Sequence, residues 1–260
     1  MKIGIFDSGI GGLTVLHQAR ITLPEEEFIY YADSDHVPYG TKTKDEIAGY
    51  VFEAVDFFIK RNVSAIIIAC NTATSVVIED LRNSYSIPIL GMEPAVKPAV
   101  KKCNQKRVMV CATPLTIREE KLKNLLRQVD EDHVVDLLAL PELVRYAELE
   151  LFESNNSEEY LRQALMPFQL EEYSAVILGC THFNYFKDTF RRIFPIQAEF
   201  IDGSEGTVNH LKNILSGNEG MAKAKPSVEY YISGRKVIKD ETLKKFERLQ
   251  ERLERMRQIM

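Results

Sequence analysis

Short apolar runs alternate with longer amphipathic stretches along most of this chain, and this alternation limits the folds open to it. The apolar runs predict strands at Lys2–Phe6, Phe28–Ala32, Ala65–Ala69, Ile87–Leu90, Arg107–Ala112, Val134–Ala139, Ala175–Gly179 and Glu199–Ile201. The stretches with helical spacing between them are Lys44–Arg61, Thr74–Ser84, Thr116–Val129 and Ser157–Leu170. Such alternation is typical of α/β proteins with mostly parallel sheets, whose buried strands are apolar on both faces.

Two of these strands end in the same way, which indicates an internal repeat. Aliphatic residues followed by one small residue lead to Cys70 and, much later, to Cys180. Each cysteine comes at a similar distance after a strand that ends in a polar residue, Asp7 in the first case and Thr113 in the second. The matching offsets predict a duplicated α/β domain. The competing interpretation is coincidence, because a strand followed by cysteine is a short pattern.

The expected domain division follows from this repeat. Residues 91–106 contain Pro94 and Pro98 and are the expected crossover between the two halves. We therefore expect a discontinuous first domain of residues 1–95 plus 207–260, and a second domain of residues 96–206.

The segment Asp240–Met260 differs from the rest of the chain because it is rich in Lys, Glu and Arg. Its apolar residues recur at spacings of three and four, at Leu243, Phe246, Leu249, Leu253 and Met256. This spacing predicts an amphipathic helix. We expect the helix to pack on its own domain, with a subunit contact as the alternative.

Composition excludes several classes of function. The chain has 260 residues and a net charge of −5, which argues against a general binder of nucleic acid or anionic membranes. No apolar run approaches the roughly 20 residues that cross a bilayer. The N-terminal residues lack the features of a signal peptide, so we expect a cytoplasmic protein. The four cysteines form no CxxC motif and the histidines lack metal-ligand spacing, which predicts free thiols and no metal site.

Cys70 and Cys180, the two cysteines of the internal repeat, are candidate catalytic residues because of their place in the predicted fold. Ligands of open α/β sheets bind at the carboxyl ends of strands. A thiol at a helix start also faces backbone amides and the positive end of the helix dipole, so we expect its pKa to fall. Polar residues follow both cysteines, at Asn71, Thr72, Thr181 and His182. The competing interpretation is that cysteine is a small apolar core residue. We expect that role for Cys111, and an incidental surface or half-buried position for Cys103.

Three polar turns could contact a ligand. Asp7 and Ser8 lead into a turn with Gly9, Gly11 and Gly12, and such turns can bind phosphate or can simply allow a tight bend. A Walker lysine is absent, and Asp7 would suit an ammonium group or a proton-transfer partner better than a phosphate. Pro38-Tyr39-Gly40 predicts a plain loop or a backbone clamp for a carboxylate. Thr113 and Thr116 are either ligand donors or helix caps.

Together these segments resemble the glutamate racemases of the aspartate/glutamate racemase superfamily. The matching segments are Phe6–Gly12, Tyr31–Ser34, Pro38–Gly40, Ala69–Ala73, Glu93-Pro94, Thr113 with Thr116, and Gly179–Phe183, with weaker echoes at Ile201–Ser204 and Ser233-Gly234. The resemblance covers the chain up to about residue 238. Each motif is short, but their order and spacing together are specific.

The resemblance implies a fold and an activity. It implies two similar α/β domains with mostly parallel sheets, related by a pseudo-twofold axis, with the active site in the cleft between them. It also implies reversible interconversion of L- and D-glutamate without a cofactor or metal, which supplies D-glutamate for peptidoglycan. The expected partner is glutamate, with no nucleic acid and no membrane, and the expected assembly is a homodimer.

The resemblance also assigns roles to residues. Cys70 and Cys180 match the two catalytic thiols, and Asp7 and His182 match their auxiliary acid/base partners. The positions that match substrate contacts are Ser8, Pro38, Tyr39, Gly40, Asn71, Thr72, Thr113, Thr116 and Thr181. Asp33 matches a further polar residue around the site and Glu148 does so loosely, because residues 139–142 depart from the family's usual pattern. Asn184 also stands where family members often have proline, and the charged C-terminal helix is longer than expected.

Racemisation needs a proton removed from one face of the α-carbon and another returned to the opposite face. Two thiols on opposite walls of a cleft could do this, one as thiolate and the other as thiol. We expect Asp7 beside Cys70 and His182 beside Cys180. A carboxylate raises the pKa of a neighbouring thiol, so Asp7 would hold a proton or orient the ammonium group. A protonated His182 would favour the Cys180 thiolate.

The same sequence features are compatible with other functions. One alternative is an aspartate racemase or another racemase, isomerase or decarboxylase of the same superfamily, since sequence does not measure pocket depth. A second is a non-catalytic protein that binds a small molecule on the same scaffold. A third is a phosphate-handling enzyme that uses the glycine turn.

Overall fold

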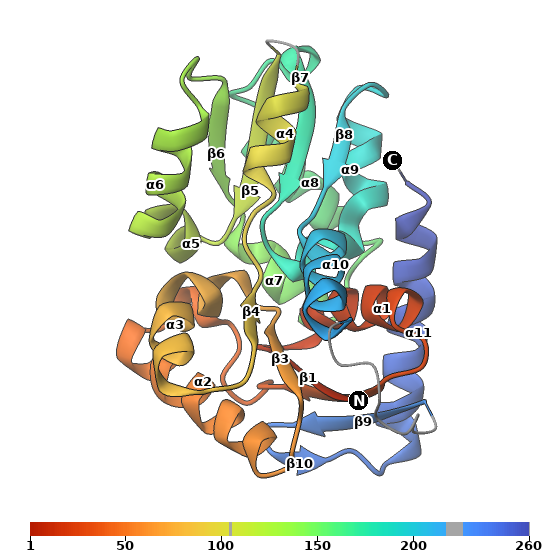
Figure 1. Ribbon diagram of the computed structural model, residues 1–260. Coiled ribbons are helices and arrows are strands. Elements are labelled where there is room, and N and C mark those ends of the chain that lie inside the picture. The colour runs from red at the N-terminus through yellow and green to blue at the C-terminus, as the bar shows by residue number, and fades with distance from the viewer. Residues whose placement is uncertain (104–105, 217–225, 260) are drawn as a thin grey trace.

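The computed structural model describes residues 1–103, 106–216 and 226–259, and its strands form two sheets that lie one above the other in Figure 1. The lower sheet has the order β10 (Arg235–Lys236), β9 (Ser227–Ile232), β2 (Glu27–Ala32), β1 (Lys2–Asp7), β3 (Ala65–Ile68) and β4 (Ile89–Gly91). The upper sheet has the order β6 (Val135–Ala139), β5 (Arg107–Ala112), β7 (Tyr173–Leu178) and β8 (Glu199–Ile201). All strand pairs are parallel except β9 with β10.

The strand order supports the internal repeat. The lower sheet contains the order β2-β1-β3-β4, and the upper sheet has the same order as β6-β5-β7-β8. Cys70 follows β3 and Cys180 follows β7, so the two cysteines follow equivalent strands. The predicted α/β fold with mostly parallel sheets is confirmed.

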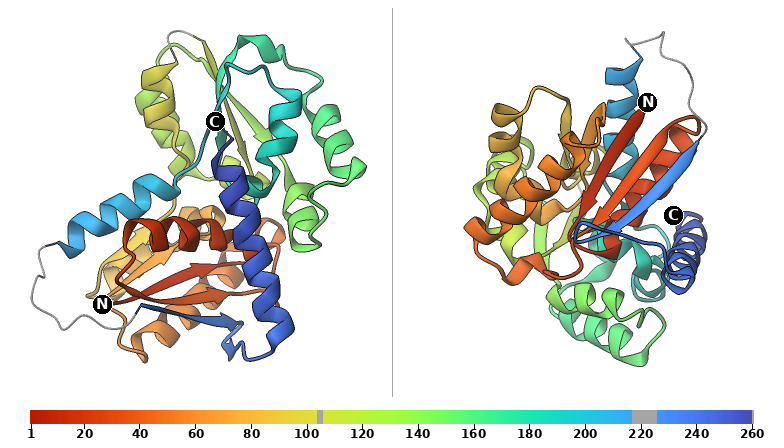
Figure 2. Two further views of the ribbon diagram at one scale, coloured as in Figure 1. Left: turned by 90° about the vertical axis from the view of Figure 1, so that its right-hand side faces the viewer. Right: turned by 90° about the horizontal axis from the view of Figure 1, so that it is seen from below.

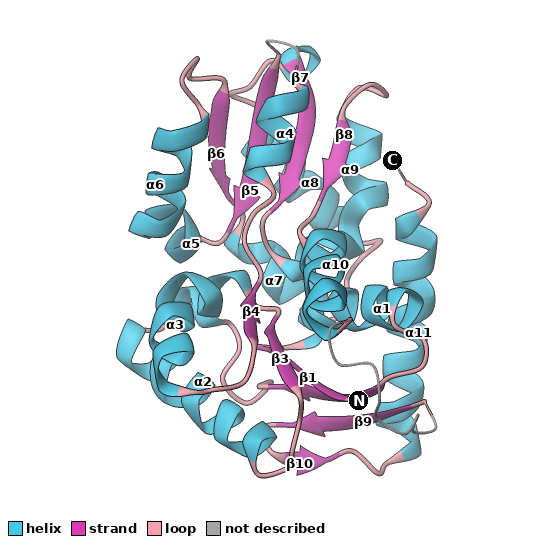
Figure 3. Cartoon of the chain, viewed as in Figure 1, coloured by secondary structure: helices cyan, strands magenta, loops and turns pink. Residues whose placement is uncertain are grey.

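Helices cover both sheets, as Figure 3 shows. The helices are η1 (Ile10–Gly12), α1 (Leu13–Thr22), η2 (Tyr39–Thr41), α2 (Lys44–Ile59), α3 (Asn71–Ser84), α4 (Val96–Lys102), α5 (Pro114–Arg118), α6 (Glu120–Val129), α7 (Pro141–Glu148), α8 (Asn155–Leu165), η3 (Leu170–Glu172), η4 (Thr181–Phe186), α9 (Lys187–Ile193), α10 (Ser204–Leu215) and α11 (Asp240–Arg257). Ile66 and Ile68 pack in the same apolar cluster as α2 and α3, whereas Ile67 packs in the cluster of α1. This explains why β3 is apolar on both faces. None of the described helices is long and apolar enough to span a membrane.

The structure departs from the sequence predictions in four places. The helix expected over Ser157–Leu170 ends at Leu165, and Leu170 begins the separate 3₁₀ helix η3. The helix expected over Thr116–Val129 is two helices, because Glu119 between α5 and α6 has an extended backbone with ψ of 139°. Strands β9 and β10 were not predicted, although β9 pairs along the whole of β2. Cys103 is buried rather than half-buried or at the surface, and its thiol donates to the carbonyl of Val100.

The chain crosses between the two sheets twice, from β4 to α4 and from β8 to α10. We propose that the sheets mark two domains, divided as residues 1–95 plus 207–260 and residues 96–206. The first boundary lies just before α4, and the second falls within α10, which packs along α1. Residues 104–105 of the expected crossover, and residues 217–225 and Met260 of the first domain, lie outside the described residues.

Helix α11 begins at Asp240, as predicted, and contacts both halves of the molecule. The ring of Phe246 lies against those of Tyr30 and Tyr230 in the lower half. Further along, Nε of Arg252 donates to the carbonyl of Tyr185 in the upper half. Figure 2 shows α11 crossing the lower sheet and reaching the upper half. The helix therefore packs on its own domain and also on the second one.

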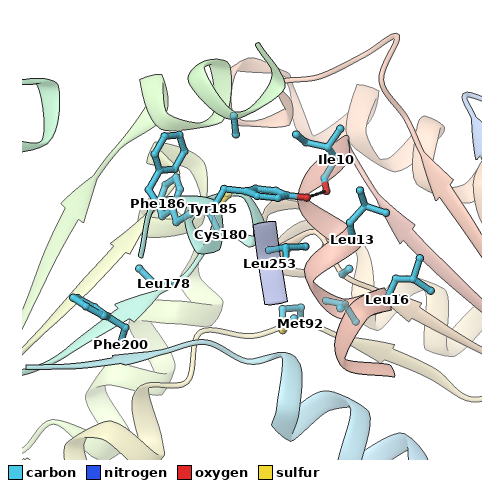
Figure 4. Close-up of a cluster of buried hydrophobic side chains, with 14 of the residues drawn as sticks. Ile10, Leu13, Leu16, Met92, Leu178, Cys180, Tyr185, Phe186, Phe200 and Leu253 are labelled. Carbon is cyan, nitrogen blue, oxygen red and sulfur yellow. Dashed lines mark hydrogen bonds between the residues drawn. The ribbon is translucent and has the colours of Figure 1, made fainter. Parts of the chain in front are cut away.

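A buried apolar cluster joins the two halves (Figure 4). Leu13 and Leu16 of α1 belong to this cluster together with Phe186 of the upper half and Leu253 of α11. The hydroxyl of Tyr185, which is fully buried, donates to the carbonyl of Ile10 at 3.0 Å. This contact holds the glycine-rich turn after β1 against the upper half.

Candidate active site

The sheet pairing brings the sequence-predicted residues together at the carboxyl ends of the strands. Asp7 ends β1 and Cys70 follows the neighbouring β3, while Thr113 and Cys180 follow the neighbouring strands β5 and β7. The arrowheads of the upper strands in Figure 3 point toward the lower half. Thr181 Oγ1 donates to Oδ2 of Asp7 at 3.0 Å, so the two carboxyl edges meet directly.

Cys70 lies at the N-cap of α3 and is buried. Its Sγ accepts from the backbone N–H of Ala73 at 3.4 Å and forms a 3.6 Å hydrogen bond with Oγ of Ser8. Burial raises the pKa of Cys70 to about 12, and the charge of Asp7 adds to the rise, while the Ala73 amide and Ser8 oppose it. The expected fall in pKa is therefore wrong for Cys70, because the loss of water outweighs the amides at the helix start.

Cys180 has a different environment from Cys70. It precedes the 3₁₀ helix η4 rather than an α-helix, and no backbone amide of η4 caps its side chain. Its Sγ lies 3.7 Å from Nδ1 of His182, and Nε2 of the same ring lies 2.7 Å from Oε1 of Glu148. Burial lowers the pKa of His182, but its hydrogen bonds to Cys180 and Glu148 outweigh burial and raise the pKa well above the usual value. The imidazole thus connects a thiol to a carboxylate.

Asp7 is fully buried between the two halves. Its Oδ1 accepts from the backbone N–H of Gly9 at 3.0 Å, and its Oδ2 accepts from Thr181. Burial raises the pKa of Asp7 to about 6, and it would be higher without His182 and the two hydrogen bonds. Asp7 raises the pKa of Cys70, which is the direction expected for a neighbouring carboxylate.

The glycine-rich turn after Asp7 allows a close approach by the upper half. A Cβ atom at Gly9 would clash with Glu148, and one at Gly11 would clash with Thr181 and His182. The backbone N–H of Ile10 donates to Oε1 of Glu148 at 2.8 Å. Because a carboxylate and neighbouring side chains fill this space, the turn does not form the phosphate cradle that was one alternative.

Three predicted threonines form a cluster of hydroxyls that spans the two halves. Thr72 Oγ1 lies 2.9 Å from Thr113 Oγ1 and 3.3 Å from Thr116 Oγ1, and the last two lie 3.0 Å apart. Thr113 also caps α5, because its Oγ1 accepts from the backbone N–H of Thr116. The capping interpretation therefore holds for Thr113, and the cap lies at the site.

Some of the predicted residues line a cavity, but Cys70 and Cys180 are not among the described residues that line it. Pro38, Gly40, Thr113 and Glu148 line a cavity of ≈ 430 Å³ between the two halves. The Tyr39 hydroxyl is turned instead to Asp33.

The side-chain amide nitrogen of Asn71 is paired within the lower half. It donates to the carbonyl of Met92 at 3.1 Å. The predicted site residues thus gather at the two carboxyl edges, but the amide nitrogen of Asn71 and the hydroxyl of Tyr39 are paired within the first half. The roles assigned to these residues stay predictions.

Comparison with known proteins identifies the family. The model of the Asp/Glu/Hydantoin racemase family matches residues 14–211 of the chain. The chain belongs to this racemase family. It is 52% identical to the glutamate racemase of Lachnospira eligens, over 100% of both chains.

Solved structures of family members have the same fold. The structure of Escherichia coli glutamate racemase in complex with L-glutamate and the activator UDP-MurNAc-ala is similar with a TM-score of 0.83 and 26% identity, covering 94% of each chain. Glutamate racemase from Francisella tularensis in complex with D-glutamate has a TM-score of 0.81 and 28% identity, covering 96% of this chain and 93% of that one. The family and fold predicted from the sequence are confirmed.

The racemase-family site contains contacts that the sequence did not reveal. Glu148 matched the family only loosely, yet it joins Ile10 of one half to His182 of the other. Thr181 was predicted as a substrate contact, and its hydroxyl is paired with Asp7. Both contacts link residues far apart in the chain, so no local pattern could have indicated them. In the described part of the chain, no three His, Cys, Asp or Glu side chains are grouped so that they could hold a metal ion.

Proposed function

We propose that this chain interconverts L- and D-glutamate without a cofactor, by proton transfer between the substrate α-carbon and the thiols of Cys70 and Cys180. The observation that carries the proposal is the equivalence of the two cysteines, which follow matching strands of two facing sheets. Each thiol also has its own acid/base neighbour, Asp7 for Cys70 and His182 for Cys180. The activity of the glutamate racemases that the chain resembles over its full length supports the same substrate.

The electrostatics of the site support an order of proton transfers. Cys70, with a pKa of about 12, keeps its proton, whereas a protonated His182 would stabilise a thiolate at Cys180. In this state Cys180 takes the α-proton from one face of the substrate, and Cys70 gives its proton to the opposite face. The electron pair left on the α-carbon forms the new C–H bond. The reaction leaves a Cys180 thiol and a Cys70 thiolate, which is the state required for the reverse direction.

The substrate α-proton is weakly acidic, so the site must stabilise the charge that develops when it leaves. We propose that the hydroxyls of Thr72, Thr113 and Thr116, together with the backbone of residues 38–40, donate to the substrate carboxylates. The Asp7 carboxylate would pair with the ammonium group. Burial of both cysteines excludes water, which strengthens each of these interactions.

The proposal includes a cellular role and an assembly. The D-glutamate formed would supply peptidoglycan synthesis. We further propose that the enzyme works in the cytoplasm as a homodimer. Sedimentation of the purified protein at several concentrations would test the assembly.

The reaction is tested with L-glutamate in deuterated water, without an added cofactor. We expect deuterium at the α-position and the appearance of D-glutamate. L-aspartate, assayed in parallel, should react much more slowly. If L-aspartate reacted faster than L-glutamate, aspartate would be identified as the substrate instead. A folded protein that exchanges no α-proton of either amino acid would contradict the proposed function.

The two thiols are tested by substitution. Cys70→Ser and Cys180→Ser should each lower racemisation by about 100-fold or more, because each removes one of the two proton carriers. Cys103→Ser is a matched control, since this thiol is buried in a separate apolar cluster of the upper half. If both site variants retained the rate of the control, the pairing of Cys70 with Cys180 would be wrong.

A further inference from the structure

We propose that the turn between β9 and β10 positions the loop Pro38–Gly40 at the active site, through a hydrogen-bonded chain from Ser233 to Asp33 to Tyr39. This inference rests on the proposed function, because the loop is expected to contact glutamate. Asp33 and Ser233 would be positioning residues, which act on the substrate through the loop. Both residues match the family pattern in the sequence, but that match gives neither of them a specific role.

Asp33 is the centre of this chain. It follows β2, is 3% exposed, and its backbone N–H donates to the carbonyl of Asp7 at 2.9 Å. Its Oδ2 accepts from the Tyr39 hydroxyl at 2.6 Å, and its Oδ1 accepts from Ser233 Oγ at 3.0 Å. Nδ1 of His36 lies 2.9 Å from both carboxylate oxygens. Three side chains thus fix the carboxylate, and two of them come from the loop and the turn.

Ser233 makes the connection to the β9–β10 turn. Its φ of +43° lies in the left-handed region that residues other than glycine rarely adopt, and such strain is often stored at functional sites. Its Oγ donates to Asp33 and accepts from the backbone N–H of Asp35 at 3.1 Å, while its own N–H donates to the carbonyl of Ala32. A glycine would relieve the strain and lose both hydroxyl contacts. The serine therefore fits a role in holding the segment that leads into the loop.

Tyr39 connects Asp33 to the loop residues that line the cavity. Its ring is 2% exposed and lies near the ring of Phe6, so its hydroxyl has to find a partner inside the protein. Burial and the charge of Asp33 raise the pKa of Tyr39, which keeps the hydroxyl protonated as a donor. The flanking residues Pro38 and Gly40 both line the cavity. A Cβ atom at Gly40 would lie 3.3 Å from Cβ of Thr113, so the loop also packs closely against the upper half.

The test separates positioning from stability by measuring KM, kcat and thermal unfolding together. Tyr39→Phe and Ser233→Ala should each raise KM for glutamate by about threefold to tenfold, which corresponds to the net contribution of one hydrogen bond. We expect kcat to change by less than about twofold, because neither change touches a thiol. The double variant should have the KM of Tyr39→Phe alone, because Ser233 acts through Asp33 on the Tyr39 hydroxyl. A merely structural role would lower the unfolding temperature and leave KM unchanged.

The chain offers two matched controls on β9. Tyr231→Phe removes a tyrosine hydroxyl that donates to Glu229, and Ser227→Ala removes a serine hydroxyl at the far end of the strand. Both should leave KM unchanged. The inference is overturned if Tyr39→Phe and Ser233→Ala also leave KM within about 1.5-fold of the wild type, or if their effects multiply in the double variant.

The affinity of the same proteins for D-glutamate is also measured by calorimetry. This second measurement distinguishes failure of the positioning role from failure of the proposed function. A wild-type protein that binds glutamate without turnover contradicts the proposed function. The positioning role is then tested by comparing the affinities of the variants in place of their KM values. Weaker binding confined to the Tyr39 and Ser233 variants supports it. A wild-type protein that neither binds nor racemises glutamate overturns both.

Discussion

Burial governs the ionisation of Asp7 and Cys70, which lie at the carboxyl ends of the neighbouring strands β1 and β3. Removal from water raises the pKa of Asp7 to about 6 and that of Cys70 to about 12. The carboxyl group therefore loses its proton at a much lower pH than the thiol does. An ammonium group paired with Asp7 would offset the negative charge that holds the Cys70 proton in place. Substrate binding would then prepare the thiol for proton transfer, which an amide at the helix start does not achieve alone.

The raised pKa of Asp7 predicts a pH dependence of stability. The folded chain binds the Asp7 proton more tightly than the unfolded chain, whose Asp pKa is near 3.8. The stabilising effect is therefore complete below about pH 4 and is lost as pH rises through about 6. The difference between the two pKa values corresponds to about 3 kcal/mol, of which about half falls between pH 5 and pH 8. Asp7→Asn should thus gain about this much stability relative to the wild type over that range, measured by urea unfolding.

Asp35 provides a control of opposite sign for this experiment. Hydrogen bonds from Arg235 lower the pKa of Asp35, so its contribution to stability is present at neutral pH and is lost as pH falls through the folded pKa. Asp35→Asn should lose stability relative to the wild type as pH rises from 3 to 6. A difference between Asp7→Asn and the wild type that stays constant with pH would show that burial does not control the Asp7 proton.

At the scale of elements, the sequence predicts what depends on local pattern. All the expected strands from Lys2 to Ile201 are present, because each is an apolar run that is at least half-buried along most of its length. Strand β9 was missed because Ser227 and Glu229 interrupt its apolar residues and its partner β2 lies far away in the chain. No proline or glycine at Glu119 predicts the break between α5 and α6 from the sequence. The carboxylate of Glu119 forms an ion pair with Lys44 of the other half. Contacts of this kind depend on how the halves meet, which local pattern does not encode.

The same limit applies to the polar face of α11. Four residues of the predicted apolar stripe, Phe246, Leu249, Leu253 and Met256, are buried and Leu243 is half-buried. Arg252 is also buried, at 4% exposed. A charged residue beside an apolar stripe is usually solvent-exposed. Arg252 is buried because it ion-pairs with Asp188 and Glu153 at 2.8 Å and donates to the Tyr185 carbonyl.

We therefore expect substitution of Arg252 to lower the free energy of unfolding more than substitution of any other charged residue of α11. Arg252→Met would leave Asp188 and the Tyr185 carbonyl without their cationic partner, and we expect a loss of about 3 kcal/mol in the free energy of unfolding. Arg248→Met is the control on the same helix, because Arg248 is exposed and its ion pair with Glu150 is 3.8 Å long. It should change stability by less than about 0.5 kcal/mol. Equal losses for the two variants, measured by urea unfolding, would contradict an anchoring role for Arg252.

At the scale of the whole molecule, the two sheets share more than the active site. The apolar cluster that contains Leu13 and Leu16 of the lower half continues into Phe183 and Phe186 of the upper half. Helix α11 packs on both halves, and Asp7 is fully buried where they meet. Separating the halves would expose this apolar surface and leave buried polar groups without partners. The two domains are therefore expected to unfold together, although each has its own sheet.

The four cysteines allow this cooperativity to be measured, because all are free and buried and they belong to both halves. Cys70 reports on the lower half, and Cys111, which is 0% exposed in the centre of the upper sheet, reports on the upper half. Pulsed alkylation at increasing urea concentration, read by mass spectrometry, should give the same midpoint for both thiols. D-glutamate should raise both midpoints equally, since a ligand that binds only the folded protein stabilises everything that unfolds with its site. Sodium chloride at equal ionic strength is the control. Labelling of Cys111 at lower urea than Cys70, or a glutamate effect confined to one thiol, would mean that the halves unfold independently and that the cluster between them contributes little.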